Sequence, residues 1–461
     1  MTDFAALLAP DRGQPARTIA VVTEGGFDAW LKGQSPRARA AIAAARFTAK
    51  ADTMVVLPGE AAEDWSVAVG GDETAGPWHL ASAAAKLPEG SYRLANGAAA
   101  DGALGWLLAQ HSFDRYRQAP TARGGRLLLT SDPARIDEAV RLAEATALVR
   151  DLVDTGASDL GPAELAGAAR DLADAFGATL TVTEGQALAD NYPMIHAVGR
   201  AASDARAPRL IELEWGDPAH PRVAVVGKGV CFDSGGLDIK PSSGMLLMKN
   251  DMGGAAHALA LARLIMGARL PVRLHLLIPA VENAISSDAF RPGDVLRSRK
   301  RLFVEIGNTD AEGRLILADA LTKACEEAPE LVIDFATLTG AARVALGPDM
   351  PALFANDDAL AADLIAGGER THDPLWRLPL WAPYLDMLKS DVADINNAGG
   401  AFAGTITAAL FLEKFVGEGT HWAHLDTFAW RPAAKPGRPK GGEALGLRAA
   451  WSMMRHRYGQ S

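Results

Sequence analysis

The sequence is poor in cysteine and has no excess of cationic side chains, and each shortage excludes a class of protein. Only Cys231 and Cys325 occur among 461 residues, so no disulfide framework is expected to hold the fold, and a reducing compartment suits the chain. Lysine and arginine number 46 against 56 aspartate and glutamate residues, which gives a formal net charge of −10. Because non-specific affinity for polyphosphate depends on clustered Lys and Arg, this balance argues against nucleic acids and anionic membranes as partners.

Long apolar runs are also missing from the sequence. The longest candidate, residues 401–412, is followed by Glu413 and Lys414 and is shorter than the roughly 18–20 residues that cross a bilayer. The start of the chain has no basic segment and reaches Pro10 before any long apolar stretch, so it is not expected to act as a signal peptide. We therefore expect a cytoplasmic protein with no membrane partner.

The length and the order of patterns predict two domains. A chain of 461 residues exceeds one typical hydrophobic core. Residues 1–130 predict a small α/β domain, with strands at 18–22, 53–57, 65–69 and 126–130 and helices at 77–87 and 102–117. An apolar stripe over 134–154 predicts a helical connector at 131–160, and residues 161–461 form the larger C-terminal domain.

The second domain repeats a pattern of strand, polar turn and helix. The expected strands are 221–230, 272–280, 301–306, 330–336 and 421–426, and the expected helices are 253–267, 312–328 and 403–416. Near-continuous apolar strands separated by helices predict an α/β fold with a mostly parallel central sheet, covered by helices. In such sheets the ligand crevice lies beyond the carboxyl ends of the strands.

Charged residues gather in the polar connections of this second domain. They comprise four carboxylates, two lysines and one arginine: Lys228, Asp233, Lys240, Asp251, Asp310, Glu312 and Arg314. Because such turns can share one sheet edge, we expect these groups to converge. Four carboxylates in one pocket raise one another's pKa unless cations neutralise them. Two divalent metals would supply that charge, and oxygen ligands suit Mg²⁺, Mn²⁺ or Zn²⁺.

Several polar residues of these segments have an ordinary structural explanation when they are taken alone. Asp251 stands where a helix N-cap is expected, and Glu312 lies in a first turn, where the helix dipole favours a carboxylate. Lys228 follows a strand in a glycine turn, but the GxxxxGK[ST] pattern of phosphate loops is absent. His257 lies in an apolar helix outside any HExxH motif and is expected to be a packed core residue. The prediction of a metal site therefore rests on the occurrence of all seven charged residues together in one domain.

Three segments resemble the leucine aminopeptidases, a family of cytosolic exopeptidases with two metals. They are VGKGVCFDSGGLDIKP (226–241), MKNDMGGAA (248–256) and NTDAEGRLILADAL (308–321). The string NTDAEGRL is highly specific, since its order of charges would rarely arise by chance. The resemblance extends over roughly 150–450, whereas the N-terminal part matches only in general character.

The resemblance implies a set of metal ligands. Lys228, Asp233, Asp251 and Glu312 would surround one metal, and Asp233, Asp310 and Glu312 would surround the other. Asp233 and Glu312 would then bridge the pair. The implied ions are two divalent cations per subunit, Mn²⁺ or Zn²⁺ with Mg²⁺ as a further candidate. A lysine that binds a metal must be neutral, and nearby cations would depress its pKa.

The resemblance also implies how the reaction proceeds. A water or hydroxide that bridges the two metals would attack the peptide, and Lys240 would stabilise the gem-diolate. Arg314 would hold a bicarbonate that acts as general base, assisted by the backbone at Leu338. One metal would bind the free α-amine of the substrate, which explains the removal of N-terminal residues. The implied substrate-binding residues are Met248, Asn308, Thr337, Leu338, Gly340 and Phe428.

Phe428 and Trp430 depart from the family pattern, which usually has small residues after the segment HWAHLD. Phe428 would border the pocket for the N-terminal side chain and reshape it, unless the ring packs in the core and points away. We therefore expect a substrate preference that differs from leucine. Similar substrate ratios in the wild type and in Phe428→Ala would contradict this expectation.

The implied partners are peptides with a free N-terminus and further copies of the chain in a homohexamer. Two alternatives remain within the family: a member that binds DNA, and an inactive scaffold. The net charge of −10 argues against DNA binding. The presence of all seven matched charged residues argues against a scaffold without activity.

Overall fold

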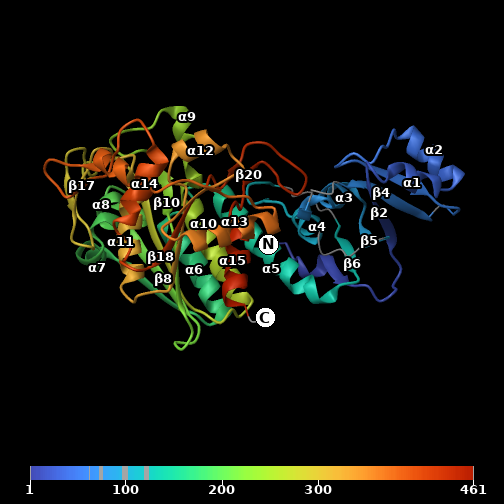
Figure 1. Cartoon of the computed structure of the whole chain (residues 1–461), viewed down its shortest axis with the longest axis horizontal. Helices are drawn as coiled ribbons and strands as arrows, with labels where there is room; N and C mark the ends of the chain where they lie inside the picture. Colours follow the sequence, from blue (N-terminus) through green and yellow to red (C-terminus); the bar gives the residue numbers. More distant parts are fainter. Residues whose placement is uncertain (1, 62, 72–75, 96–101, 119–123, 460–461) are drawn as a thin grey trace. The chain divides into compact units, whose positions relative to one another are not determined.

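The computed structural model describes residues 2–61, 63–71, 76–95, 102–118 and 124–459 (Figure 1). The chain divides into two compact units. The N-terminal unit contains Met1–Ala147 and Ala433–Lys440, and the second unit contains Leu148–Pro432 and Gly441–Ser461. The second unit contains all the site residues expected from the sequence and is therefore called the catalytic unit. The short segment 433–440, part of a Pro/Gly-rich basic loop, thus belongs with residues that lie far away in the sequence.

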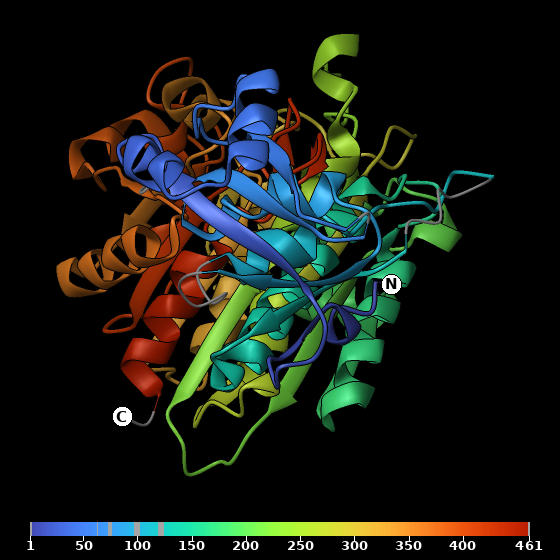
Figure 2. The same cartoon turned by 90° about the vertical axis from the view of Figure 1, so that its right-hand side faces the viewer.

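The N-terminal unit contains a six-stranded sheet with the order β1-β6-β5-β2-β4-β3. Its strands have the blue to teal colours of Figure 2. Its strands are β1 (Leu8–Pro10), β2 (Arg17–Thr23), β3 (Met54–Pro58), β4 (Trp65–Gly71), β5 (Gly90–Leu94) and β6 (Arg126–Thr130). Neighbouring strands are parallel except for β3, which is antiparallel to β4. The helical segments are η1 (Ala5–Leu7), α1 (Phe27–Lys32), α2 (Pro36–Ala44), η2 (Gly76–Trp78), α3 (Ala81–Lys86), α4 (Ala103–Leu108), η4 (Pro133–Arg135) and most of α5 (Ile136–Asp154).

The helix expected over 102–117 is shorter than its apolar pattern predicts. All six residues of α4 are buried, and the helix ends at Leu108. Just beyond this end, the Gln110 side chain donates to Arg126 O and accepts from Arg126 N–H, at 3.0 and 2.8 Å. These bonds tie the chain to β6 directly after the end of α4. Strand β5 was not anticipated from the sequence.

The catalytic unit is built on a nine-stranded mixed sheet. Its order is β16-β15-β18-β14-β9-β11-β8-β7, with β10 paired to β11. The strands are β7 (Thr179–Glu184), β8 (Arg209–Trp215), β9 (Arg222–Gly227), β10 (Gly229–Asp233), β11 (Arg273–Asn283), β14 (Leu331–Ala336), β15 (Ala352–Ala355), β16 (Trp376–Arg377) and β18 (His421–Asp426). The central strands β11, β9, β14 and β18 are all parallel, so their carboxyl ends lie along one edge. This confirms the α/β fold with a mostly parallel central sheet.

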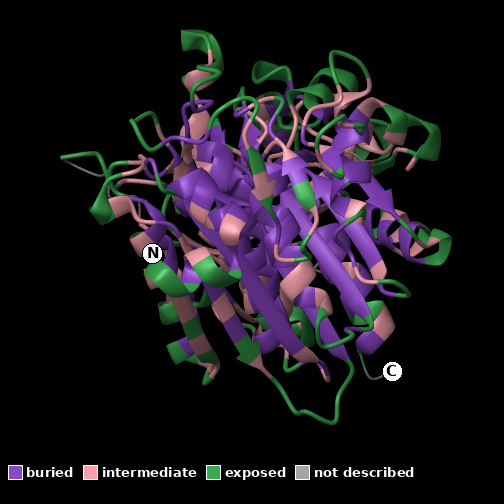
Figure 3. Cartoon of the chain, turned by 90° about the vertical axis from the view of Figure 1, so that its left-hand side faces the viewer, coloured by how far each residue is buried: buried purple, intermediate pink, exposed green. Residues whose placement is uncertain are grey.

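Helices cover both faces of this sheet (Figure 1). One face carries α6 (Pro162–Phe176), α10 (Gly253–Gly267), α13 (Asp358–Thr371) and α15 (Leu447–Tyr458). The other carries α7 (Gly185–Asn191), α8 (Pro193–Gly199), α11 (Glu312–Cys325) and α14 (Gly404–Glu413). The strands are buried along most of their length, whereas exposed residues concentrate in the loops (Figure 3). Double coverage explains why these strands read as continuous apolar runs.

The strand expected at 301–306 does not belong to the central sheet, and that part of the prediction was wrong. It contains β13 (Phe303–Glu305), which lies in a separate three-stranded sheet with β12 (Val295–Arg297) and β17 (Ile395–Asn396). Phe303 is 50% exposed while Val304 is fully buried, so only one face of this strand is covered. A short apolar run does not reveal whether one face or both will be packed.

The remaining elements of the catalytic unit are short. They are η5 (Asp204–Arg206), α9 (Ser242–Met245), η6 (Met248–Met252), α12 (Gly340–Leu346), η7 (Ala382–Leu388), β19 (Trp430–Arg431) and β20 (Gly441–Gly442). Both cysteines are free, as expected. No helix within the described part of the chain has the length and apolar character needed to cross a membrane.

Candidate active site

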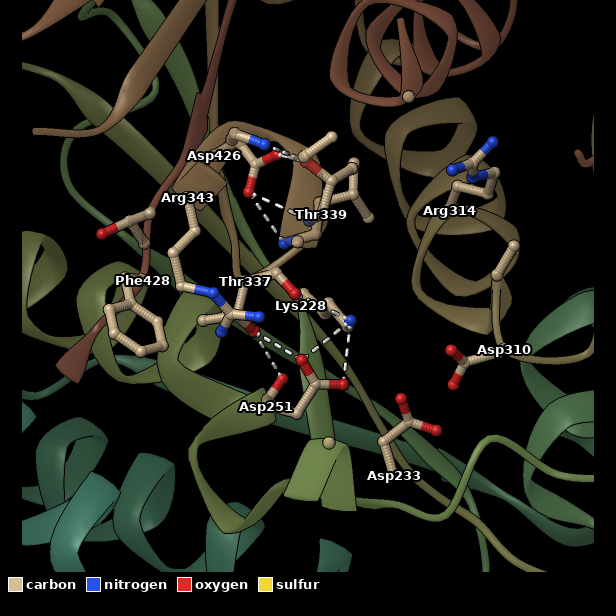
Figure 4. A pocket seen from close by; sticks show the side chains of 18 of the residues that line it. Lys228, Asp233, Asp251, Asp310, Arg314, Thr337, Thr339, Arg343, Asp426 and Phe428 are labelled. Carbon is tan, nitrogen blue, oxygen red and sulfur yellow. Dashed lines mark hydrogen bonds and ion pairs between the residues drawn. The ribbon is translucent and has the colours of Figure 1, made fainter. Parts of the chain in front are cut away.

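Polar side chains meet at the carboxyl edge of the central sheet (Figure 4). Lys228 follows β9, Asp233 ends β10, Asn283 ends β11, and Asp426 ends β18. They border or support a pocket of about 490 Å³. All thirteen residues predicted for the site line this pocket: Lys228, Asp233, Lys240, Met248, Asp251, Asn308, Asp310, Glu312, Arg314, Thr337, Leu338, Gly340 and Phe428.

Lys228 lies in the break between β9 and β10 and points its amine at two carboxylates. Its Nζ lies 2.9 Å from Asp251 Oδ2 and 3.0 Å from Glu312 Oε1, and it donates a 3.0 Å hydrogen bond to Thr337 O. Gly313 makes room for this side chain, because a Cβ on Gly313 would lie 2.5 Å from Lys228 Cε. Burial lowers the pKa of Lys228, but the charges of Asp251 and Glu312 outweigh burial and raise the pKa overall.

Lys240 supplies the second positive charge in the cluster. Its Nζ lies 2.8 Å from Asp233 Oδ2 and also forms an ion pair with Asp310. Asp233 is held from its other side, since its Oδ1 accepts 2.9 Å hydrogen bonds from Gly235 N–H and from Asn283 Nδ2. Each lysine thus lies between two carboxylates, and the ionised cluster keeps an excess of negative charge.

Asp251 and Glu312 both lie near the start of a helix, but only Glu312 has the position that a helix terminus would account for. Asp251 lies in η6 and does not cap α10. Its Oδ1 accepts hydrogen bonds instead from Lys228 Nζ at 3.0 Å and from Thr337 Oγ1 at 2.8 Å. Glu312 is the first residue of α11, where the helix dipole favours a carboxylate. The simple capping explanation therefore fails for Asp251, and both buried side chains turn toward the cluster.

Burial raises the pKa of three of the carboxylates. It raises the pKa of Glu312 to about 8, with the charge of Asp233 acting in the same direction and that of Lys228 opposing it. Burial likewise raises the pKa of Asp251 to about 6, although Lys228 lowers it. The pKa of Asp310 is raised by burial and by the charge of Asp233. The lysines therefore compensate the negative charge only in part, and divalent cations would neutralise the remainder.

The donor set fits divalent cations. Asp233, Asp310 and Glu312 each offer an oxygen, and these three atoms lie within 4.8 Å of one another. Glu312 Oε2 is buried and has no hydrogen-bond partner among the described residues, whereas buried polar atoms are normally paired. Carboxylate oxygens in this number suit Mg²⁺, Mn²⁺ and Zn²⁺.

Arg314 borders the pocket from the first turn of α11. Its Nη1 donates a 2.6 Å hydrogen bond to Asn397 O, and its buried Nε has no hydrogen-bond partner in the described part of the structure. Burial lowers the pKa of Arg314 to about 10, against the charges of Glu312 and Asp426. The guanidinium therefore stays positive at neutral pH and can hold an anion.

Asn308 shapes the turn that carries Asp310. Its Oδ1 accepts a 2.7 Å hydrogen bond from Asp310 N–H. The turn is fastened in its place by Asn397, whose Oδ1 accepts from Gly307 N–H and whose Nδ2 donates to Asn308 O, both at 2.8 Å. Asn308 also lines the pocket, so it can both support a carboxylate and face a substrate.

The backbone at Leu338 is already engaged. Its N–H donates a 2.9 Å hydrogen bond to Asp426 Oδ1. Thr339 fixes the same carboxylate, because its hydroxyl donates to Asp426 Oδ2 at 2.6 Å. Assistance from the Leu338 N–H to an anion on Arg314 would require Asp426 to release that group.

Phe428 forms part of the pocket wall together with Met248, Thr337 and Gly340. Its ring is half-buried, and Arg343 Cζ lies 4.6 Å from the ring centroid. Phe428 is thus not a core aromatic that points away from the site. Thr337 connects this wall to the charged cluster through its hydrogen bond to Asp251.

His257 lies in the core, in line with its apolar sequence context. It is fully buried in α10, with Nδ1 2.7 Å from Gly253 O and Nε2 accepting a 3.0 Å hydrogen bond from Leu445 N–H. Its ring stacks on Phe335. Burial lowers the pKa of His257, and the side chain is absent from the pocket lining.

Sequence reasoning missed five residues that organise the site: Asn250, Asn283, Arg343, Asn397 and Asp426. Asn283 and Asp426 stand at strand ends, so the rule that located the other polar residues could have found them. Asn250 adjoins Asp251 and donates a 3.1 Å hydrogen bond to Phe428 O. Asn397 lies in an irregular loop and Arg343 in α12, and neither carries a local sequence signal.

Two family models match the chain. One, described as the cytosol aminopeptidase family, catalytic domain, matches residues 147–450, and the other, the M17 aminopeptidase N-terminal domain, matches residues 18–129. A relative from Syntrophotalea carbinolica, named "Probable cytosol aminopeptidase", is 44% identical over 361 residues, which cover 75% of this chain and 72% of the relative.

Solved structures are similar over nearly the whole chain. A cytosol aminopeptidase from Coxiella burnetii is 46% identical, with a TM-score of 0.92 and coverage of 98% of this chain and 99% of that one. The bottromycin maturation enzyme BotP in complex with Mn is 35% identical, with a TM-score of 0.86 and coverage of 96% and 100%. The family model of the catalytic domain matches well over half of the chain. The protein therefore belongs to the M17 cytosol aminopeptidase family and is a metal-dependent aminopeptidase.

Proposed function

We propose that this aminopeptidase binds two divalent cations and removes N-terminal amino acids from peptides with a free N-terminus. Mn²⁺ or Zn²⁺ is expected, with Mg²⁺ as an alternative. The observation that carries the proposal is the convergence of Asp233, Asp310 and Glu312, whose oxygens lie within 4.8 Å of one another. Lys228 and Asp251 would join Asp233 and Glu312 around one cation, and Asp310 would join the same two residues around the other.

The residues around the carbonyl of the substrate would act through charge. Two divalent cations held by these carboxylates would polarise a peptide carbonyl and lower the pKa of the attacking water. Lys240 donates a hydrogen bond to the carbonyl oxygen as negative charge develops there, and so stabilises the gem-diolate. Its Nζ lies 2.8 Å from Asp233, which fixes the amine beside the cluster.

Arg314 would hold a bicarbonate ion that takes the proton of the attacking water. Its support is the buried guanidinium, which is positive at neutral pH and whose Nε has no hydrogen-bond partner among the described residues. The carbonyl of Asn397 orients the group through the bond from Nη1. An anion held there would face the carboxylate cluster from the side of α11.

The N-terminal residue of the substrate would lie between the charged cluster and the apolar wall. Its α-amine is expected at the carboxylates and cations. Its side chain would extend along the residues predicted from the sequence, namely Met248, Asn308, Thr337, Leu338, Gly340 and Phe428, which line the pocket.

A metal-replete assay against a panel of aminoacyl-amides tests the proposal. We expect hydrolysis with Mn²⁺ or Zn²⁺, loss after chelation, and recovery when metal is restored. N-acetylated versions of the same amides should not be cleaved, because they lack the free α-amine. Failure to hydrolyse any amide in the presence of metal would refute the proposed function.

The family resemblance further suggests a cytoplasmic homohexamer. The names of the relatives, cytosol aminopeptidase, agree with the cytoplasm as the location. Light scattering coupled to size-exclusion chromatography measures the assembly, and a monomer at micromolar concentration would contradict it.

A further inference from the structure

Four positively charged side chains line the pocket, and the fourth differs from the other three in its contacts. Lys228 and Lys240 each contact two carboxylates, and Arg314 donates to a backbone carbonyl. Arg343 lies in α12, is exposed and lines the same pocket, across from Arg314 in Figure 4. Within the described part of the chain it has no carboxylate partner, so its charge is free to meet a ligand.

The ring of Phe428 orients this free guanidinium. Arg343 Cζ lies 4.6 Å from the ring centroid, within the range of a cation–π contact. A planar guanidinium that stacks on a ring keeps its N–H edges available for hydrogen bonds in the plane. Figure 4 shows the group directed into the space between Phe428 and Thr337. The aromatic residue that departs from the family pattern therefore also serves as a platform for a cation.

The position of Arg343 relative to the charged cluster identifies the part of the substrate that it would meet. A Cβ on Gly340 would lie 3.5 Å from Arg343 Nη2, so the guanidinium stands over the wall expected to contact the N-terminal side chain. The same wall begins at Thr337, whose hydroxyl donates to Asp251 at 2.8 Å. A side chain that starts from an α-amine at the carboxylates and runs along this wall would end near Arg343.

The chemistry of this end of the pocket selects an acidic side chain. A short apolar stem can contact Phe428, Met248 and Met350, which all line the cavity. A terminal carboxylate can then accept paired hydrogen bonds from the guanidinium, which is the strongest geometry available to such a group. A lysine or arginine side chain would instead meet a like charge. Resting on the proposed function, we propose that Arg343 makes the enzyme selective for peptides that begin with glutamate or aspartate.

The test compares substrates that differ in one charge. Glutamyl and glutaminyl p-nitroanilides have side chains of equal size and uncharged leaving groups, so the ratio of their kcat/KM values isolates recognition of the carboxylate. We expect a ratio well above one in the metal-replete full-length enzyme. Arg343→Met keeps an unbranched, flexible stem but removes the guanidinium, and it should lower the ratio by about 10- to 100-fold, the effect of losing a charged hydrogen-bond pair. Arg343→Glu should in addition favour lysyl over glutaminyl substrates.

A matched control and a second substrate pair make the result decisive. Arg170 is an exposed helical arginine outside the pocket, and Arg170→Met should leave the ratio unchanged. A ratio that does not change in Arg343→Met would overturn the inference. So would an effect of Arg343→Met that distinguishes Leu-Gly from Leu-Gly-amide, because Arg343 would then read the far carboxylate of the peptide. Either result would leave leucyl-amide hydrolysis, and hence the proposed function, standing, whereas failure on every substrate would refute the proposed function itself.

Discussion

The six-stranded sheet of the N-terminal unit and the nine-stranded sheet of the catalytic unit are built alike but bury charge differently. Arg126 is the only buried Lys, Arg, Asp or Glu among the described residues of the N-terminal unit, and its Nε donates to the backbone of Leu87 at 2.6 Å. The catalytic unit buries Lys228, Asp251 and Glu312 together in one pocket. Both sheets have an edge formed by the carboxyl ends of parallel strands. Only the edge with a cluster of buried charged side chains is identified as a ligand-binding site.

Breaking the buried cluster should have the largest effect. Glu312→Gln keeps the size of the side chain but removes a charge and an anionic oxygen, so we expect kcat to fall on the order of 10³-fold while the fold is retained. Steady-state kinetics with metal present measure the loss, and circular dichroism checks the fold. Arg170→Met, on an exposed helix surface, serves as control. Wild-type turnover in the Glu312 variant would contradict its assignment as a ligand.

Removing the positively charged side chain of Lys240 from the cluster should have the next largest effect. Lys240→Ala takes away the donor proposed for the carbonyl oxygen, and we expect kcat to fall on the order of 10²–10³-fold. The change in KM should be smaller, because the interaction strengthens as negative charge develops. An unchanged kcat would exclude Lys240 from the chemical step.

Metal binding should stabilise the catalytic unit, which contains the carboxylate cluster. A cation that binds the native state at 100 times its Kd adds about 2.7 kcal/mol to the free energy of unfolding. Calorimetry of chelator-treated protein should therefore show a Tm that rises by several degrees when Mn²⁺ is added. The rise should be smaller in Glu312→Gln. The same Tm with and without metal in the wild type would argue against the carboxylate centre.

A buried carboxylate outside the pocket should give the catalytic unit a dependence on pH. Asp319 accepts hydrogen bonds from Met194 N–H at 2.9 Å and Arg299 N–H at 2.8 Å, and burial raises its pKa to about 7. This value exceeds the roughly 3.9 of an unfolded chain, so the native state binds more protons between these limits. The contribution of Asp319 to the free energy of unfolding therefore decreases as pH rises from about 4 to about 7.

Denaturant unfolding of the wild type and Asp319→Asn at several pH values tests this sign. The stability difference between the two proteins should change steadily across that range and level off above it. A difference that stays constant with pH would show that Asp319 titrates normally in the folded protein.

The N-terminal unit should show the smallest effect on catalysis. Arg126→Met leaves Leu87 O and the Gln110 side chain short of a donor, which should cost about 1–3 kcal/mol of stability. We expect kcat to stay within about twofold of the wild type, measured at a temperature where the variant is folded. A large loss of kcat would show that the buried arginine affects more than its own unit.

The site was more predictable from the sequence than the residues that support it. Lys228 and Asp233 could be located because they follow buried strands, and the carboxyl ends of parallel strands meet at one edge. The segment from Asp310 to Arg314 has its own recognisable charge order. By contrast, Asn397 supports this segment from a loop more than 80 residues away, and no local pattern records that contact.

The errors in the predicted fold have the same origin. The run 301–306 is apolar enough for a central strand, yet β13 pairs with β12 and is covered on one face only. Local pattern reports how apolar a segment is, not which partners it will meet. Arg343 was missed for a related reason, since an arginine in a helix is ordinary until the fold places it over Phe428.

The missing side chain of Gly313 sets a limit on redesign of the metal centre. A Cβ there would lie 2.6 Å from the amine nitrogen of Lys228, so the lysine side chain lies directly against the backbone of α11. The forked guanidinium of arginine is broader than a lysine amine, so we expect Lys228→Arg to disturb this packing although it keeps the charge. We therefore expect the metal preference to be easier to change at the carboxylates than at position 228, where the backbone of α11 limits the size of the side chain.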